Sequence, residues 1–189
     1  MVLDFIATFF SSAMALLPIF ARDILSVGEI GYGWLSAAEF IGAGIAAIVI
    51  SQMRTIRRQG QVMLVSVVFY GVATAIFGLA TNFGLAMLAL MVVGAGDTVS
   101  AIIRRTTRQI QTPDYMRGRM TGINQIFFMG GPQLGEVEAG LAAQFFGAPF
   151  AVFTGGILCL FGVGWINRRW PELRRYQGDE TVAAETAGD

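Results

Sequence analysis

Two residue types are missing from this chain of 189 residues: it contains no histidine and no lysine, so its thirteen basic residues are all arginines. Without histidine the sequence has no zinc site of the HExxH type and no Ser-His dyad, and without lysine it has no Ser-Lys dyad. An aspartyl pair of Asp97 and a glutamate is the hydrolytic arrangement left, and nothing in the flanking sequence supports it. We therefore expect neither an enzyme nor a metal site.

Charge and cysteine are scarce as well. Only 14% of the residues are charged and the net charge is zero, which gives no electrostatic footprint for nucleic acid. The single cysteine, Cys159, excludes a disulfide within the chain and is typical of a packing residue. No phosphate-cradling loop points to ATP or another cofactor. With 54% hydrophobic residues, the chain is too apolar for an ordinary soluble domain, and the lipid bilayer is its expected solvent.

Long apolar runs fill most of the chain. A helix needs about 17 to 25 apolar residues to cross the hydrocarbon of a bilayer, and the sequence supplies six such runs. We predict an all-α membrane domain over residues 1–170, followed by a disordered cytoplasmic tail over residues 171–189. The predicted transmembrane helices are residues 2–25, 31–53, 61–79, 83–104, 113–146 and 150–167.

The arginines predict the orientation of these helices. If the first helix starts in the cytoplasm, twelve of the thirteen arginines fall on the cytoplasmic side, as the positive-inside bias requires. Both termini would then be cytoplasmic, and the expected location is a bacterial cytoplasmic membrane. The first run has no basic residue before it to fix this direction, so we expect a preceding segment. The spans also divide as three plus three, which predicts an inverted repeat.

Ionisable and polar groups inside these spans are costly to bury, so they are the first candidates for a substrate or proton pathway. Glu39 lies near the middle of the bilayer, about 13 Å into its helix at 1.5 Å per residue, and could bind and release a proton. A structural hydrogen bond to a neighbouring helix is the alternative for Glu39, and a packing role is the alternative for Glu138. The pathway candidates are Glu136, Glu39, Gln125, Glu138, Asn124 and Gln133.

A second set of charges lies near the cytoplasmic ends of the helices. Asp97 precedes Arg104 by seven residues, so the two share a helix face about two turns apart. We predict an intracellular ion-pair latch between Asp97 and one of Arg54, Arg104 or Arg105. Positive-inside topology alone would also place arginines here. The candidates for this cytoplasmic gate are Asp97, Arg54, Arg104, Arg105, Asp114, Arg117 and Arg119.

One stretch of the chain resembles a known family. Its pattern is Gly96-Asp97, then Arg104 and Gln109, then Thr112-Pro113-Asp114-x-x-Arg117-Gly118-Arg119, then Asn124 and Leu134-Gly135-Glu136. This pattern is similar to the C-terminal half of Major Facilitator Superfamily transporters, most of all to the enterobactin exporter-like group of siderophore and drug efflux proteins.

The resemblance implies that the six spans correspond to helices seven to twelve of a twelve-helix transporter. The expected activity is export of a small, siderophore-like or drug-like molecule by alternating access, coupled to protons through Glu39 or Glu136. The partners it implies are the substrate, protons, the bilayer and a second six-helix half. The alternative is a six-helix membrane protein that does not transport, either a truncated product or a scaffold that pairs with another chain.

Overall fold

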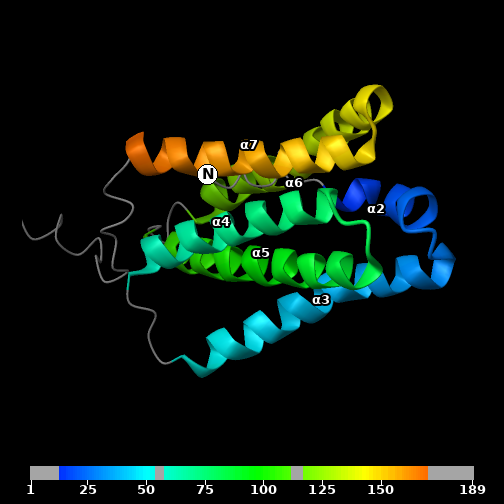
Figure 1. Cartoon of the computed structure of the whole chain (residues 1–189). Coiled ribbons are helices and arrows are strands. Elements are labelled where there is room, and N and C mark those ends of the chain that lie inside the picture. Colours follow the sequence, from blue (N-terminus) through cyan, green and yellow to red (C-terminus); the bar gives the residue numbers. More distant parts are fainter. Residues whose placement is uncertain (1–12, 54–57, 112–116, 170–189) are drawn as a thin grey trace, which may run out of the picture.

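The computed structural model describes residues 13–53, 58–111 and 117–169, and all regular structure within these ranges is helical (Figure 1). This confirms the predicted all-α class. A short entry segment comes first and consists of η1 (Ala13–Leu16), α2 (Leu17–Ile19) and η2 (Phe20–Ile24). The long helices that follow are α3 (Gly28–Gln52), α4 (Gln59–Gly78), α5 (Phe83–Gln111), α6 (Arg117–Phe146) and α7 (Ala148–Arg169).

The long helices pack in an order that differs from their order in the chain. Helix α5 packs against α3 and against α4, α4 also packs against α7, and α7 packs against α6. Within the described chain, α3 and α6 therefore lie at the two edges of the helix assembly. The lack of charge in the third and sixth predicted spans predicts that both lie outermost. Within the described chain, however, α4 lies between α5 and α7, and α7 packs against both α4 and α6 (Figure 1).

Small residues explain the close packing of these helices. A side-chain carbon at Gly42 of α3 would collide with the backbone oxygen of Met91 on α5. At the α4–α7 contact, a side-chain carbon at Gly156 would come within 2.6 Å of the backbone nitrogen of Ala75 and 2.7 Å of the backbone oxygen of Gly71. In lipid, such close backbone approach provides packing that the hydrophobic effect does not supply between helices.

The entry segment is irregular because its helical turns become wider after Pro18. The Leu25 amide donates to the Phe20 carbonyl at 2.8 Å, and the Val27 amide donates to the Ala21 carbonyl at 2.9 Å. The first bond spans five residues, as in a π-helical turn, rather than the four of an α-helix. Ser26 then takes a left-handed conformation with φ of 51°, and the chain turns into α3.

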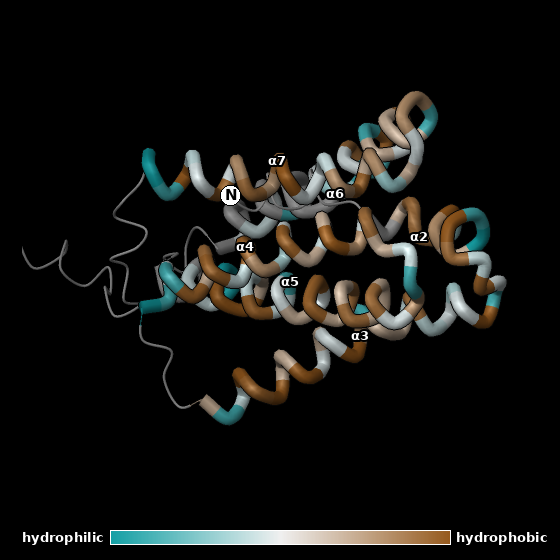
Figure 2. Tube along the Cα trace, viewed as in Figure 1, coloured by the Kyte–Doolittle hydropathy of each residue, from teal (hydrophilic) through white to brown (hydrophobic). Residues whose placement is uncertain are grey.

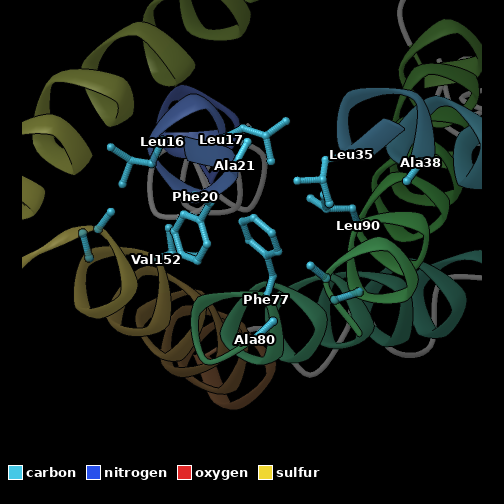
Figure 3. Packing of buried hydrophobic residues seen from close by; sticks show 14 of the residues in the cluster. Leu16, Leu17, Phe20, Ala21, Leu35, Ala38, Phe77, Ala80, Leu90 and Val152 are labelled. Carbon is cyan, nitrogen blue, oxygen red and sulfur yellow. The ribbon is translucent and has the colours of Figure 1, made fainter. Parts of the chain in front are cut away.

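A buried apolar cluster joins this entry segment to the ends of several long helices. Figure 3 shows the rings of Phe20 and Phe77 facing each other, with Leu16, Leu17 and Val152 around them. These five residues come from η1, α2, η2, α4 and α7, so the cluster fixes the entry segment against the end of α4 and the start of α7.

Four described helices are long and apolar enough to cross a membrane, and Figure 2 shows apolar residues along most of their length. Helix α6, which contains more polar residues, is not among these four. The structure thus supports an integral membrane protein, while the inverted repeat stays a prediction. The four candidate spans are Gly28–Gln52, Gln59–Gly78, Phe83–Thr107 and Ala148–Arg169.

Candidate functional site

Glu39 lies at the contact between α3 and α5. A side-chain carbon at Gly94 of α5 would collide with the Glu39 backbone oxygen and would lie 2.9 Å from the Glu39 Cγ atom. The Glu39 side chain is half-buried, and its Oε2 atom is buried without a hydrogen-bond partner among the described residues. A buried carboxylate oxygen without a partner is costly, so a functional role is the first hypothesis for this acid.

Asp97 and Arg104 form an ion pair within α5. The Arg104 Nη2 atom lies 3.7 Å from the Asp97 Oδ1 atom, and Arg104 Nη1 donates a hydrogen bond to Ser100 Oγ at 2.9 Å. The Arg104 side chain is only 9% exposed, whereas the Asp97 side chain is 50% exposed. The guanidinium is therefore held inside the helix assembly, and the carboxylate lies at its boundary.

Glu39 contacts α5 one helical turn before Asp97, although the two acids were assigned to different sites from the sequence. Gly94 contacts Glu39 and precedes Asp97 by three residues, which places Gly94 and Asp97 on neighbouring turns of one face of α5. A candidate of the predicted proton pathway and a candidate of the predicted gate thus lie at neighbouring positions along the α3–α5 contact.

The pathway candidates on α6 lie elsewhere in the assembly. Glu136, Gln125 and Gln133 are exposed, and Glu138 is partly buried. Helix α6 packs against α7 and η1, whereas Glu39 lies on α3 at the other edge. The described residues therefore show two separate groups of pathway candidates, one at the α3–α5 contact and one on α6.

The sequence Gly130-Gly131-Pro132 predicts an interruption of the fifth span, but α6 is continuous from Arg117 to Phe146 with Pro132 inside it. Proline removes one backbone hydrogen bond, and membrane helices tolerate this loss because neighbouring groups satisfy the freed carbonyl. Glu136 therefore lies on a regular helix rather than beside an opened backbone.

The remaining gate candidates fall near the ends of the helices. Arg105 is exposed on the last turns of α5, next to Arg104. Arg54 and Asp114 lie outside the described residues. The side chains of Arg117, Arg119 and Asn124 also lie outside the described part of the structure, although their backbone belongs to α6.

The sequence matches the transmembrane secretion effector family over residues 2–184. The chain belongs to this family of the Major Facilitator Superfamily. Among curated proteins, this family member is 30% identical to the enterobactin exporter of Shigella flexneri over 184 residues. The alignment covers 96% of this chain and 44% of that exporter.

Two further relatives agree with this match. The enterobactin exporter of Shigella boydii serotype 18 is 31% identical over 184 residues, and that of Escherichia coli O81 is 30% identical over 184 residues. Each alignment covers 96% of this chain and 43% of the relative. This secretion effector family member thus spans less than half the length of the curated relatives it matches.

Two residues beside these acids, Ser100 and Gly94, were not identified from the sequence. Ser100 lies between Asp97 and Arg104 and accepts a hydrogen bond from Arg104. Its position four residues before Arg104 on one helix could have predicted this hydrogen bond. Gly94 could not be linked to Glu39 from sequence, because the two residues meet only through the packing of separate helices.

Proposed function

We propose that this chain is the C-terminal half of a proton-coupled secondary transporter that exports a small, siderophore-like molecule by alternating access. The observation that carries the proposal is the buried Glu39 Oε2 atom, which lies on a membrane-spanning helix without a hydrogen-bond partner among the described residues. An acid in this position is suited to bind a proton in one state of the protein and release it in another. Family membership and the enterobactin exporters among its relatives support export as the direction of transport.

A second six-helix half completes the proposed transporter. Helix α3 is the least buried of the four candidate spans: 22% of its apolar stretch is buried, compared with 50% for α4. Phe40 and Ile48 of α3 are 72% and 60% exposed, and Val137 and Phe145 of α6 are 61% and 75% exposed. The two edge helices therefore offer apolar surface that the second half and lipid would share.

The proposed substrate surface lies on α6. Glu136, Gln133 and Gln125 are exposed there at positions compatible with one side of a helix facing a cavity between the two halves. A siderophore-like molecule offers many hydrogen-bonding groups, and polar side chains on an otherwise apolar helix suit such a ligand.

Orientation follows from the arginine-rich end of the assembly. Arg58 precedes α4, Arg104 and Arg105 end the apolar part of α5, and Arg168 and Arg169 end α7. These segments lie at the same end of the bundle, the left end in Figure 1. The positive-inside bias assigns this end to the cytoplasm, and the proposed location is the bacterial inner membrane.

The test is transport by the complete protein in liposomes, with enterobactin as the first probe. A pH gradient should drive its uphill movement, and Glu39→Gln should abolish this movement while leaving downhill substrate exchange intact. Glu29→Gln is the matched control, because Glu29 is an exposed acid in the first turn of the same helix.

Two results would contradict the proposal. Normal gradient-driven transport by Glu39→Gln would show that this acid does not couple transport to protons. An absence of any transport by correctly folded protein, with enterobactin or a panel of siderophore-like and drug-like molecules, would favour the scaffold alternative.

A further inference from the structure

Helices α4 and α7 each present one apolar face that the rest of the described chain leaves exposed. On α4, the exposed residues Val65, Phe69 and Val72 follow one another at spacings of four and three residues. On α7, Phe161 and Trp165 are exposed four residues apart. Residues three and four apart lie on one face of a helix, so each set forms a stripe. Apolar stripes on membrane-spanning helices suit contact with the acyl chains of lipids.

An exposed arginine lies at the end of each stripe. Arg58 immediately precedes α4 and lies seven residues before Val65. Arg168 lies in the last turn of α7, seven residues after Phe161. Helix α4 starts and α7 ends at the left of Figure 1, so both arginines lie at one end of the bundle. Two packed helices therefore combine an apolar stripe with a positive charge at the same end.

The antiparallel packing of α4 and α7 places these two arginines at similar depth in the membrane. The helices meet closely where a side-chain carbon at Gly156 would lie 2.7 Å from the backbone oxygen of Gly71. Arg58 lies thirteen residues before Gly71, about 20 Å along the chain at 1.5 Å per residue. Arg168 lies twelve residues after Gly156, about 18 Å along α7 at the same rise. A buried cluster joins the two helices between the glycines and the arginines, and it consists of Leu64, Val67, Cys159, Val163 and Ile166.

This depth corresponds to the boundary between the hydrocarbon and the lipid headgroups. Helices α4 and α7 have 20 and 22 residues, about 30 and 33 Å at 1.5 Å per residue, which matches the roughly 30 Å of bilayer hydrocarbon. Trp165 lies three residues before Arg168, and tryptophan concentrates at the interface between membrane and water. Neither α4 nor α7 contains an acidic residue, so neither helix supplies a counter-charge for Arg58 and Arg168.

We propose that this α4–α7 surface binds an anionic phospholipid. The arginines bind the negatively charged headgroup, and the acyl chains lie along the apolar stripes. Charge complementarity selects this occupant, because a zwitterionic lipid carries no net negative charge and an apolar protein helix would cover the stripes without neutralising the arginines. The surface lies away from the α3 and α6 edges assigned to the second half, so the inference is independent of the proposed function. The surface consists of Arg58, Val65, Phe69, Phe161, Trp165 and Arg168.

The experiment measures how lipids with brominated acyl chains quench the tryptophan fluorescence of the purified, delipidated complete protein. Brominated phosphatidylglycerol is the anionic probe, and the contribution of Trp165 is the part of the quenching that is lost in Trp165→Phe. The lipid concentration that gives half of this quenching measures binding. Brominated phosphatidylcholine with the same acyl chains should bind about 25-fold more weakly, because each arginine near the membrane surface contributes about fivefold to the binding of an anionic lipid.

Two substitutions remove the charges one at a time. Arg58→Asn and Arg168→Gln should each weaken phosphatidylglycerol binding about fivefold, and the double variant should bind it no better than phosphatidylcholine. Asparagine suits the first position, because Arg58 has a left-handed backbone with φ of 60°, which asparagine adopts more readily than most residues. Replacing both arginines with lysine keeps both charges and should preserve most of the binding.

Two control variants remove an arginine elsewhere and should leave phosphatidylglycerol binding unchanged. Arg22→Gln acts at the opposite end of the bundle, where the side chain is 89% exposed, and Arg105→Gln acts on α5 at the same end. An equal loss of binding in Arg105→Gln would show diffuse attraction to all the arginines of this end and would overturn the proposed site.

Three further results would also overturn it. The first is equal binding of the two lipids by the wild-type protein, a comparison that needs no variant and stays decisive if a variant fails to fold. The second is unchanged phosphatidylglycerol binding by a folded double variant. The third is displacement of the lipid by glycerol phosphate, which has no acyl chains, because this would show that the arginines bind free phosphate rather than a lipid.

Discussion

Phe20 and Phe77 stack with ring centroids 4.5 Å apart and an angle of 28° between the ring planes. Both side chains are fully buried, and they join the π-helical turn η2 to the end of α4. Aromatic pairs in such offset arrangements add to the energy of burial alone. The stack therefore holds the entry segment against the rest of the helix assembly.

Phe77→Ala should destabilise the protein by about 3 kcal/mol, because it removes a large buried side chain and leaves a cavity beneath η2. The thermal unfolding midpoint of the purified complete protein in detergent measures this effect. Phe69→Ala is the control, because Phe69 lies on the same helix and is 59% exposed. An equal decrease of the unfolding midpoint in the two variants would show that the stack does not contribute more to stability than an exposed phenylalanine does.

Gly156→Ala should also destabilise the protein, by about 1 to 3 kcal/mol, because the added carbon would press on backbone atoms of α4 that have no room to move. Gly164→Ala, on the same helix, has nothing within 4 Å of the added carbon. This control should be neutral or slightly stabilising, since alanine favours helix more than glycine. If both variants unfold at the wild-type midpoint, α4 and α7 pack less closely than described.

Gly42→Ala should separate α3 from α5 and thereby disturb the Glu39 site, because the added carbon would collide with the Met91 backbone. We expect gradient-driven transport to fall more than downhill exchange. Gly44→Ala, two residues further along α3, meets nothing within 4 Å and should leave both activities unchanged. A Gly42→Ala variant with normal coupling would argue that the α3–α5 spacing does not control the proton site.

Much of the fold could be predicted from sequence, because a long apolar run in the sequence predicts a membrane-spanning helix of the same length. The run predicted over residues 31–53 corresponds to α3, which ends at Gln52, and the run that begins at residue 83 corresponds to α5. Helix α5 continues to Gln111, beyond the apolar run, since arginine and glutamine are good helix formers outside the bilayer.

Contacts between helices could not be predicted in the same way. The seven-residue spacing of Asp97 and Arg104 indicated their ion pair, because both residues lie on one helix. The contact of Glu39 with α5 depends on the packing of α3 against α5 at Gly94, and no local sequence pattern predicts that packing. The π-helical turn at Phe20 could not be predicted either, since a proline such as Pro18 predicts a kink but not its form.

The length of α3 links the proposed proton site to the thickness of the membrane. Its 25 residues extend about 37 Å at 1.5 Å per residue, longer than the roughly 30 Å of bilayer hydrocarbon. Such a helix fits by tilting, and Figure 1 shows α3 inclined to α4 and α5, with its later half diverging from them. Longer lipid chains should favour a more upright α3, so the lipid composition of the host membrane becomes a variable that tunes how Glu39 meets α5.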